Sequence, residues 1–247
     1  MSTNKQIGID GIYVVHAING YELHEKRLIE ILKEQYGLDF EFVTEGDTSL
    51  WPNELISSYF SIDIQKKLSP GVLSCTLNHI LSYERMVKNN DKYAIIFEND
   101  PFFIGNFPEK IKRLINEANN LEEGFLISIE NTTLEFPPWR ETKKGKYLYE
   151  ANRGRCAGAY IIDQLAARKI LNDLKSTKCD TVIDWWLNSL VNRSVVKMYW
   201  AHPALTEQGS HNGKMSSTIS TKSKGRIRRF KWLAQKYYKM YILRWFK

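Results

Sequence analysis

The chain has 247 residues, of which 43% are hydrophobic and 13% aromatic, enough to bury the core of one large domain or of two small ones. It has no apolar run of about 18 residues, and its first six residues lead into a strand-like run rather than into the apolar region of a signal peptide, so we expect neither a transmembrane helix nor a signal peptide. The formal net charge of +7 is concentrated in residues 222–247, which hold ten cations and no acidic residue and leave the preceding residues at −3.

The first part of the chain alternates between strand-like and helix-like segments. Residues 11–17 are largely apolar and predict a strand, and residues 23–36 repeat apolar side chains at helical spacing before Gly37, a suitable helix end. Residues 39–43 predict the next strand, which completes a βαβ unit. The alternation continues as helix, strand, helix and strand over residues 72–89, 93–97, 108–120 and 124–129.

The second part of the chain keeps this alternation but includes long polar segments. Strands are predicted over residues 156–162 and 195–200, and Asp163 suits the N-cap of a helix over residues 164–174. Two polar segments predict loops, namely residues 131–146, which we expect to be mobile, and residues 202–219. The cysteines have no metal-type spacing and predict reduced thiols in a cytosolic protein: Cys75, Cys156 and Cys179.

An acidic tip follows the apolar run over residues 93–97, which has the composition of a strand buried on both faces. The tip consists of Glu98, Asn99 and Asp100, and Pro101 ends it. Ligands of α/β sheets bind at the carboxyl ends of strands, and oxygen ligands suit Mg²⁺ or Mn²⁺. We therefore predict a metal-diphosphate site here, with an ordinary polar turn as the alternative.

Six segments, taken together and in this order, resemble glycosyltransferase family 25, the bacterial lipooligosaccharide galactosyltransferase-like group. They cover residues 12–27, 68–84 (with the pattern Ser-Cys-x-x-Asn-His), 93–100, 156–162, 182–188 and 203–219. The resemblance implies a GT-A (Rossmann-like) α/β fold, with a mixed, mostly parallel sheet flanked by helices. It also implies an inverting, metal-assisted transfer of a hexose, most often galactose from UDP-galactose, onto a lipooligosaccharide or another cell-surface glycan.

The same resemblance suggests which residues form the site. Donor-binding residues are expected at His16, Ser74, Asn78, His79, Glu98 and Asn99. The divalent metal, Mn²⁺ or Mg²⁺, is expected on Asp100 and Glu98, with His202 as a weaker third ligand. The family commonly has an aspartate where this chain has Asn99, so we expect weaker metal binding. Other assignments remain open: a structural role for His79, packing for Cys75, a solvated or phosphate-binding Arg27, and a diphosphate contact for Arg155.

Asp184 is the predicted catalytic base. Inverting transfer needs a group that takes the proton of the acceptor hydroxyl, and burial beside aromatic residues raises the pKa of a carboxylate. Indole faces stack on sugar rings, so we predict acceptor contacts at Trp185 and Trp186, and also at Gln208. The alternative is a helix N-cap at Asp184 that precedes a core-facing aromatic pair.

The C-terminal segment, residues 221–247, is predicted to be separate from a catalytic domain over residues 1–220, because composition changes near residues 220–225. A helical wheel places one set of mostly apolar side chains opposite most cations: Ile227, Phe230, Ala234, Tyr237, Tyr238, Tyr241, Ile242 and Trp245. This pattern predicts a basic amphipathic helix on an anionic membrane surface, through residues 222–247.

We therefore expect a cytoplasmic enzyme attached peripherally to the inner face of the cytoplasmic membrane. Its partners would be a UDP-sugar donor and a glycolipid or oligosaccharide acceptor. Two alternatives remain: a hexosyltransferase with another nucleotide-sugar donor, and a basic-tailed nucleic-acid-binding protein. The negative charge of residues 1–221 argues against nucleic acid, so none is expected as a partner.

Overall fold

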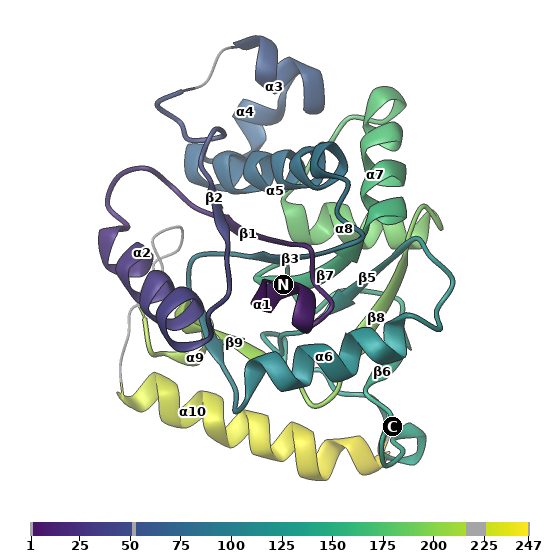
Figure 1. The fold of residues 1–247 in the computed structure, drawn as a ribbon. Coiled ribbons are helices and arrows are strands. Elements are labelled where there is room, and N and C mark those ends of the chain that lie inside the picture. Colours follow the sequence, from purple (N-terminus) through teal and green to yellow (C-terminus); the bar gives the residue numbers. More distant parts are fainter. Residues whose placement is uncertain (1, 51–52, 216–225, 247) are drawn as a thin grey trace.

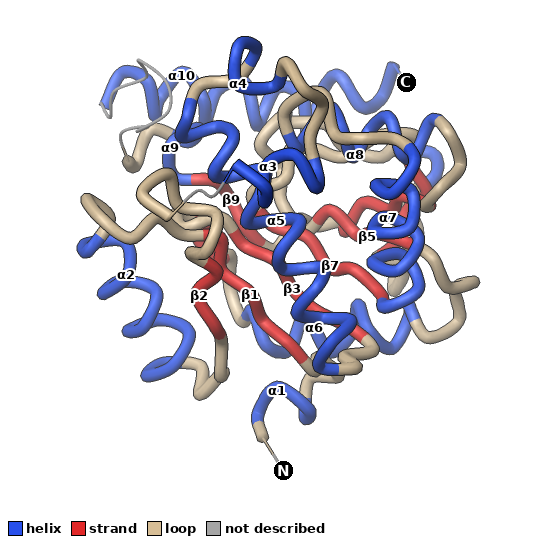
Figure 2. Tube along the Cα trace, turned by 90° about the horizontal axis from the view of Figure 1, so that it is seen from above, coloured by secondary structure: helices blue, strands red, loops and turns tan. Residues whose placement is uncertain are grey.

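The computed structural model describes residues 2–50, 53–215 and 226–246. Its centre is a seven-stranded sheet in the order β2-β1-β3-β7-β5-β8-β6, part of which can be followed in Figure 2. Five of its strands run in one direction: β1 (Gly11–Val15), β2 (Glu41–Val43), β3 (Tyr93–Phe97), β5 (Phe125–Ser128) and β8 (Lys197–Ala201). Two strands run antiparallel to these, β6 (Leu148–Ala151) and β7 (Ala159–Asp163). The predicted mixed, mostly parallel α/β sheet is confirmed.

Helices cover both faces of the sheet (Figure 1). One face packs against α5 (Pro70–Asn89), α7 (Gln164–Ser176) and α8 (Ile183–Asn192). The other packs against α6 (Phe107–Ala118) and against α2 (Glu22–Leu28), which continues as the π-helical turn η1 (Ile29–Gln35). Shorter elements are α1 (Thr3–Gln6), α3 (Asn53–Tyr59), α4 (Ile64–Lys67), α9 (Gly209–Asn212) and the 3-10 turn η2 (Trp139–Glu141).

The burial pattern explains why the central strands are apolar throughout. In β1, Tyr13 and Val15 pack on the α5 side, whereas Ile12 and Val14 pack on the α6 side. Successive side chains of a strand point to opposite faces, so a sheet covered on both sides needs apolar residues at every position. Asp163 also acts as predicted, because its Oδ1 accepts a hydrogen bond from the Ala166 amide at 2.6 Å at the start of α7.

Two features of the topology differ from the prediction. Antiparallel β7 lies between β3 and β5, so the second strand-helix-strand unit does not form a neighbouring parallel pair. The predicted loop over residues 202–219 contains β9 (Thr206–Gln208), which pairs with β4 (Pro101–Phe103) directly after the acidic tip. Both strands have only three residues, too few for a recognisable pattern, and their pairing brings Gln208 opposite Pro101.

The C-terminal arm consists of α10 (Arg226–Tyr237), η3 (Tyr238–Ile242) and η4 (Leu243–Phe246), and runs along the lower edge of Figure 1. It packs on residues 131–146, where Trp232 contacts Leu134 and Phe136 and the Trp139 and Trp245 rings stack at 5.1 Å. The predicted boundary near residues 220–225 and the motif residues 217–219 lie outside the described residues. Within the described ranges, no helix has the length and apolar character needed to cross a membrane.

Candidate active site

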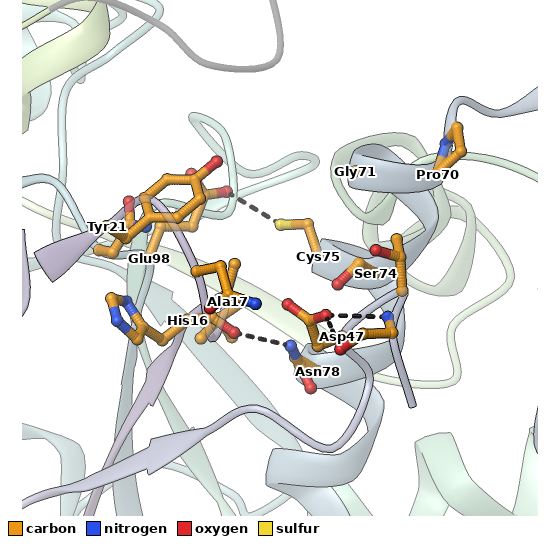
Figure 3. A pocket seen from close by; sticks show the side chains of 15 residues that line it. His16, Ala17, Tyr21, Asp47, Pro70, Gly71, Ser74, Cys75, Asn78 and Glu98 are labelled. Atoms are coloured by element: carbon orange, nitrogen blue, oxygen red, sulfur yellow. Dashed lines mark hydrogen bonds between the residues drawn. The ribbon is translucent and has the colours of Figure 1, made fainter. Parts of the chain in front are cut away.

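A pocket of about 370 Å³ opens at the carboxyl ends of β1, β2 and β3 (Figure 3). Its walls come from the ends of these strands and from the first turns of α5. The residues that line it are Val15, His16, Ala17, Asn19, Tyr21, Asp47, Thr48, Ser49, Pro70, Gly71, Ser74, Cys75, Asn78, Glu98 and Asn99. All the residues predicted to bind the donor are therefore part of this lining, except His79. This is the sheet edge at which α/β folds bind ligands.

Asn78 builds the wall of the pocket. Its amide nitrogen donates to the carbonyl of His16 at 3.1 Å, and its amide oxygen accepts from the Gly46 N–H at 2.7 Å. A side chain at position 46 could not fit there, because a Cβ would lie 2.7 Å from that same oxygen. Asn78 thus ties α5 to the ends of β1 and β2, and its hydrogen bonds hold the protein rather than a ligand.

The N-terminus of α5 forms another wall of the pocket. Pro70 occupies the start of the helix, and Gly71 and Ser74 follow on the pocket side (Figure 3). Among the described residues, the Ser69 side chain makes no capping hydrogen bond to this first turn. Free backbone N–H groups and the positive end of the helix dipole favour an anion at such a position.

Glu98 stands across the pocket from α5 and is held by side chains from distant segments. Its Oε2 accepts a hydrogen bond from Gln208 Nε2 at 2.6 Å, and its Oε1 lies 3.9 Å from the Cys75 thiol. Burial raises the pKa of Glu98, and these two hydrogen bonds partly oppose that shift. Gln208 was predicted to contact the acceptor, and in the structure its amide orients Glu98.

Asp184 lies in the first turn of α8, next to the same cluster. The backbone of Ala157 and the thiol of Cys156 donate hydrogen bonds to its carboxylate. Burial, and then the negative charge of Glu98, raise the pKa of Asp184 to about 6. The group is therefore mostly ionised at neutral pH yet more basic than an ordinary aspartate, which suits a general base.

The two tryptophans after Asp184 do not act as a pair. Trp185 is 71% exposed, whereas Trp186 is 2% exposed and belongs to the core beneath α5 and α8. Successive helix residues point about 100° apart, so only one of them can face outward. The predicted acceptor contact is thus compatible with Trp185 and is wrong for Trp186, whose side chain is enclosed.

Asp100, the last residue of the acidic tip, is buried. Its Oδ2 accepts from the Ser210 N–H at 2.7 Å, and its backbone carbonyl accepts from the Gly209 N–H at 2.9 Å. Its Oδ1 is buried without a hydrogen-bond partner in the described part of the chain. Arg27, left open as solvated or phosphate-binding, donates to the Pro101 carbonyl at 2.9 Å and lies over the Phe102 ring, so it fixes the turn after Asp100.

His202 does not join the predicted metal ligands. It packs against the rings of Phe136 and Tyr149, and burial and then the nearby cation Arg244 lower its pKa to about 4. In the part of the chain that the structure describes, one group of metal-ligating side chains converges, and it consists of Cys75, His79 and Glu98. His202 is therefore removed from the predicted metal ligands, which leaves Asp100 and Glu98.

His79 is enclosed behind the pocket. Its Nδ1 makes a 2.9 Å hydrogen bond with the Tyr160 hydroxyl, which in turn lies 2.6 Å from the hydroxyl of Tyr83. Burial lowers the pKa of His79 to about 4, so its ring is neutral. The structural alternative for this histidine accounts for Nδ1 but leaves Nε2 without a partner among the described residues.

Glu130 is the main residue that the sequence analysis missed. It is 1% exposed, its carboxylate accepts from Thr132 and from the Ala159 N–H, and burial raises its pKa to about 8. It follows β5 almost directly, so the signal that identified Glu98 after β3 could also have identified it. Arg155 lies nearby and is fully buried, donating to the Ser128 carbonyl at 2.6 Å, which makes a diphosphate contact impossible without rearrangement.

Comparison with known proteins gives a consistent assignment. A family model described as glycosyltransferase family 25 (LPS biosynthesis protein) matches residues 14–185. An Aedes aegypti protein named "Glycosyltransferase 25 family member" is 20% identical over 245 residues, which cover 91% of this chain and 40% of that protein. A Haemophilus influenzae protein named "Putative glycosyltransferase" is 27% identical over 121 residues, 48% of this chain and 41% of that protein. The chain thus spans about two fifths of the length of these relatives.

Similar solved structures are more distant. The crystal structure of A197 from STIV has a TM-score of 0.41 and 11% identity, with 77% of this chain and 80% of that chain covered. A "Putative Glucose-1-Phosphate Thymidylyltransferase" from Bacillus anthracis, in complex with a sucrose, has a TM-score of 0.43 and 13% identity, with 95% and 79% covered.

Proposed function

Since the chain belongs to glycosyltransferase family 25, we propose that it transfers a hexose, galactose from UDP-galactose in the first instance, onto a lipooligosaccharide or another cell-surface glycan. The observation that carries this proposal is the pocket between the free N-terminus of α5 and the Glu98 side chain. One wall favours an anionic diphosphate, and the other presents the Glu98 carboxylate. A second donor sugar remains the alternative, because galactose and glucose differ only in the orientation of one hydroxyl.

The donor's diphosphate would lie at the start of α5. The backbone N–H groups near Gly71 and the Ser74 hydroxyl are available to phosphate oxygens on this side. Tyr21 also lines the pocket and offers the apolar surface of its ring to the nucleoside, whereas the buried His16 ring packs on Phe42. The pocket volume falls within the range usual for small-molecule sites.

A divalent cation, Mn²⁺ or Mg²⁺, would be held by Asp100 and Glu98. The buried Oδ1 of Asp100, which has no hydrogen-bond partner among the described residues, supports this fit, because a buried carboxylate oxygen is costly unless it is paired or bound to a cation. When bound, the metal supplies positive charge that stabilises the departing diphosphate. The neutral amide of Asn99 contributes no charge, so we propose weak metal binding in the absence of the nucleotide.

Asp184 would act as the base of an inverting transfer. The acceptor oxygen forms a bond to the anomeric carbon as the bond to the UDP oxygen breaks, and the acceptor hydroxyl proton passes to the Asp184 carboxylate. Gln208 keeps Glu98 oriented toward the donor while this occurs. The exposed face of Trp185 offers a stacking surface to an acceptor sugar beside the base.

The C-terminal arm would place this site at a membrane. Every residue predicted for its apolar face is exposed, including Phe230, Tyr241 and Trp245. The arm contacts the protein mainly through its opposite face, where Lys236 pairs with Glu207 and Arg228 donates to the Ser210 carbonyl. From the apolar face, the Trp245 ring also stacks on Trp139. We propose that the enzyme works in the cytoplasm, peripherally attached to the inner face of the cytoplasmic membrane, with its acceptor in the same surface; the exposed apolar face of the arm supports this proposal.

A donor panel tests the proposal. Hydrolysis and transfer are measured for UDP-galactose, UDP-glucose, UDP-N-acetylglucosamine and a GDP-sugar, with Mn²⁺, with Mg²⁺ and with a chelator. We expect UDP-galactose to react fastest and the chelator to suppress the reaction. Faster reaction of another sugar would favour the alternative donor. If no nucleotide sugar reacts and UDP does not bind in calorimetry, the transferase assignment of this pocket is wrong.

A further inference from the structure

Three metal-ligating side chains meet at the inner end of the pocket. Cys75 and His79 are four residues apart on α5 and therefore share one face of the helix, which is turned toward Glu98 at the end of β3 (Figure 3 shows Cys75 and Glu98). The Cys75 Sγ lies 3.9 Å and the His79 Nε2 4.0 Å from Glu98 Oε1. One ligand atom from each residue lies within 4.8 Å of the others.

His79 provides the independent sign of a ligand. Its side chain is fully buried, its Nε2 is directed at Glu98, and this nitrogen has no hydrogen-bond partner in the described ranges. Its other nitrogen is engaged with the Tyr160 hydroxyl, which fixes the orientation of the ring. Metal-binding histidines have this arrangement: one nitrogen binds the ion and the other is held by a hydrogen bond.

The chemistry of the three ligands favours a particular class of ion. A thiolate and an imidazole select Zn²⁺ and related transition metals, whereas Mg²⁺ and Mn²⁺ prefer oxygen. Tetrahedral zinc separates such ligand atoms by about 3.3–3.6 Å. The two distances to Glu98, 3.9 and 4.0 Å, would therefore have to shorten by roughly half an ångström, and the Cys75–His79 distance, which is at most 4.8 Å, by up to about 1.3 Å. Cys75 and Glu98 both line the pocket, which leaves the fourth position open to water or to a bound ligand.

We propose that Cys75, His79 and Glu98 form a site for a zinc-class ion, which shares only Glu98 with the proposed Mn²⁺ or Mg²⁺ position on Asp100 and Glu98. Binding forms a metal-sulfur bond and releases the thiol proton of Cys75 to solvent. Because the ion takes Glu98 from the donor and fills the inner end of the pocket, zinc inhibits transfer. This second statement rests on the proposed function, whereas the site itself does not.

Cobalt absorption tests the site without any substrate. Co²⁺ is added to the full chain, and we expect a thiolate-to-cobalt charge-transfer band that saturates at one ion and is bleached by Zn²⁺ but not by Mg²⁺. Cys75→Ser should abolish the band, and Cys179→Ser, which removes a buried thiol elsewhere, should leave it intact. No band in the wild type, or a band that persists in Cys75→Ser, would overturn the site.

Two further variants guard against misfolding of Cys75→Ser. His79→Gln should lower the Co²⁺ affinity by at least about tenfold, and Tyr160→Phe, which frees the histidine ring, by roughly 10–100-fold. Circular dichroism shows whether each variant is folded. Folded variants that all bind Co²⁺ as tightly as the wild type would contradict the assignment of these ligands.

Inhibition is then measured separately. Zn²⁺ should suppress transfer by the wild type, and ethylenediaminetetraacetate followed by excess Mn²⁺ should restore it. A cobalt band without any transferase activity would leave the zinc site supported and sink the proposed function instead. An active transferase that gives no cobalt band would support the proposed function and overturn the zinc site.

Discussion

Charged and aromatic residues meet in two regions of this protein, with opposite results. Around the pocket the carboxylates are buried, and burial raises the pKa of Glu98, of Asp184 and of Glu130. In the C-terminal arm most of the apolar and aromatic side chains are exposed instead, with Trp232 as a buried exception, while cations such as Lys236 and Arg228 contact the body. Burial thus changes the pKa of single carboxyl groups at the pocket. The arm instead presents an exposed apolar surface to which many side chains contribute together.

The first and largest test removes the proposed base. Asp184→Asn keeps the size and most hydrogen bonds of the side chain but cannot accept the proton, so transfer should fall by about 10²–10⁴-fold while UDP binding is unchanged. In the wild type, kcat/KM should fall about tenfold per pH unit below about pH 6, since protonated Asp184 is inactive. Initial rates and calorimetry measure both effects.

Asp180→Asn is the matched control, because Asp180 is exposed and lies four residues earlier. It should retain wild-type rates and the same pH profile. Wild-type transfer by Asp184→Asn, or a loss of activity in both variants, would remove Asp184 from its proposed role.

The second test concerns the buried carboxyl of Glu130. Because the pKa of Glu130 is raised to about 8, the folded protein keeps a proton that the unfolded chain loses near the ordinary glutamate pKa of 4.5. The stabilisation that comes from this retained proton is fully present below pH 4.5 and is lost as the pH rises to 8. The free energy of unfolding should therefore decrease over this range. Glu130→Gln should remove this dependence and raise stability at pH 9 by about 2–4 kcal/mol.

Urea unfolding at several pH values between 5 and 9 measures the slope. Glu150→Gln, at an exposed position of β6, should leave it unchanged. An identical pH slope in Glu130→Gln and in the wild type would show that Glu130 does not retain its proton.

The third test asks whether the exposed apolar side chains of the arm or its positive charges contribute more to membrane binding. Ile227→Ser with Phe230→Ser removes two exposed apolar side chains and should weaken binding to anionic liposomes by roughly 10–100-fold. Lys231→Gln removes one exposed cation and should weaken it about fivefold, equivalent to about 1 kcal/mol. Sedimentation with liposomes, and retention on single-stranded DNA, measure the two kinds of binding.

Leu165→Ser, which changes an exposed apolar residue on α7, is the control and should bind liposomes normally. Equal losses in the control and in the arm variant would argue against a specific surface. Arm-dependent binding to DNA but not to liposomes would favour the nucleic-acid alternative.

The features of the pocket and of the arm that depend on local sequence pattern could be predicted from the sequence. Apolar runs and helical periodicity located β1, β3 and α5, and the abrupt change of composition after β3 located Glu98 at the pocket. The exposed face of the arm was predicted residue by residue, because a single helix determines which side chains share a face.

What the sequence could not predict are contacts between distant segments. Gln208 reaches Glu98 across 110 residues because two three-residue strands pair, and neither strand has a recognisable pattern. His202 has the chemistry of a metal ligand, but its place at the end of β8 beside β6 was needed to exclude it. Cys75 was assigned to packing for the same reason, since its meeting with Glu98 depends on how α5 lies on the sheet.

The smallest expected effect separates the exposed tryptophan from the buried one. Trp185→Ala removes a stacking surface worth about 0.5–1.5 kcal/mol, so the KM for the acceptor should rise roughly two- to tenfold. The KM for the donor and the free energy of unfolding should barely change, because the side chain is 71% exposed. Trp185→Phe keeps an aromatic face and should recover most of the loss. If Trp185→Ala left the acceptor KM unaltered, the acceptor would have to approach Asp184 from another side, and the arm would no longer need to lie in the same surface as the sugar.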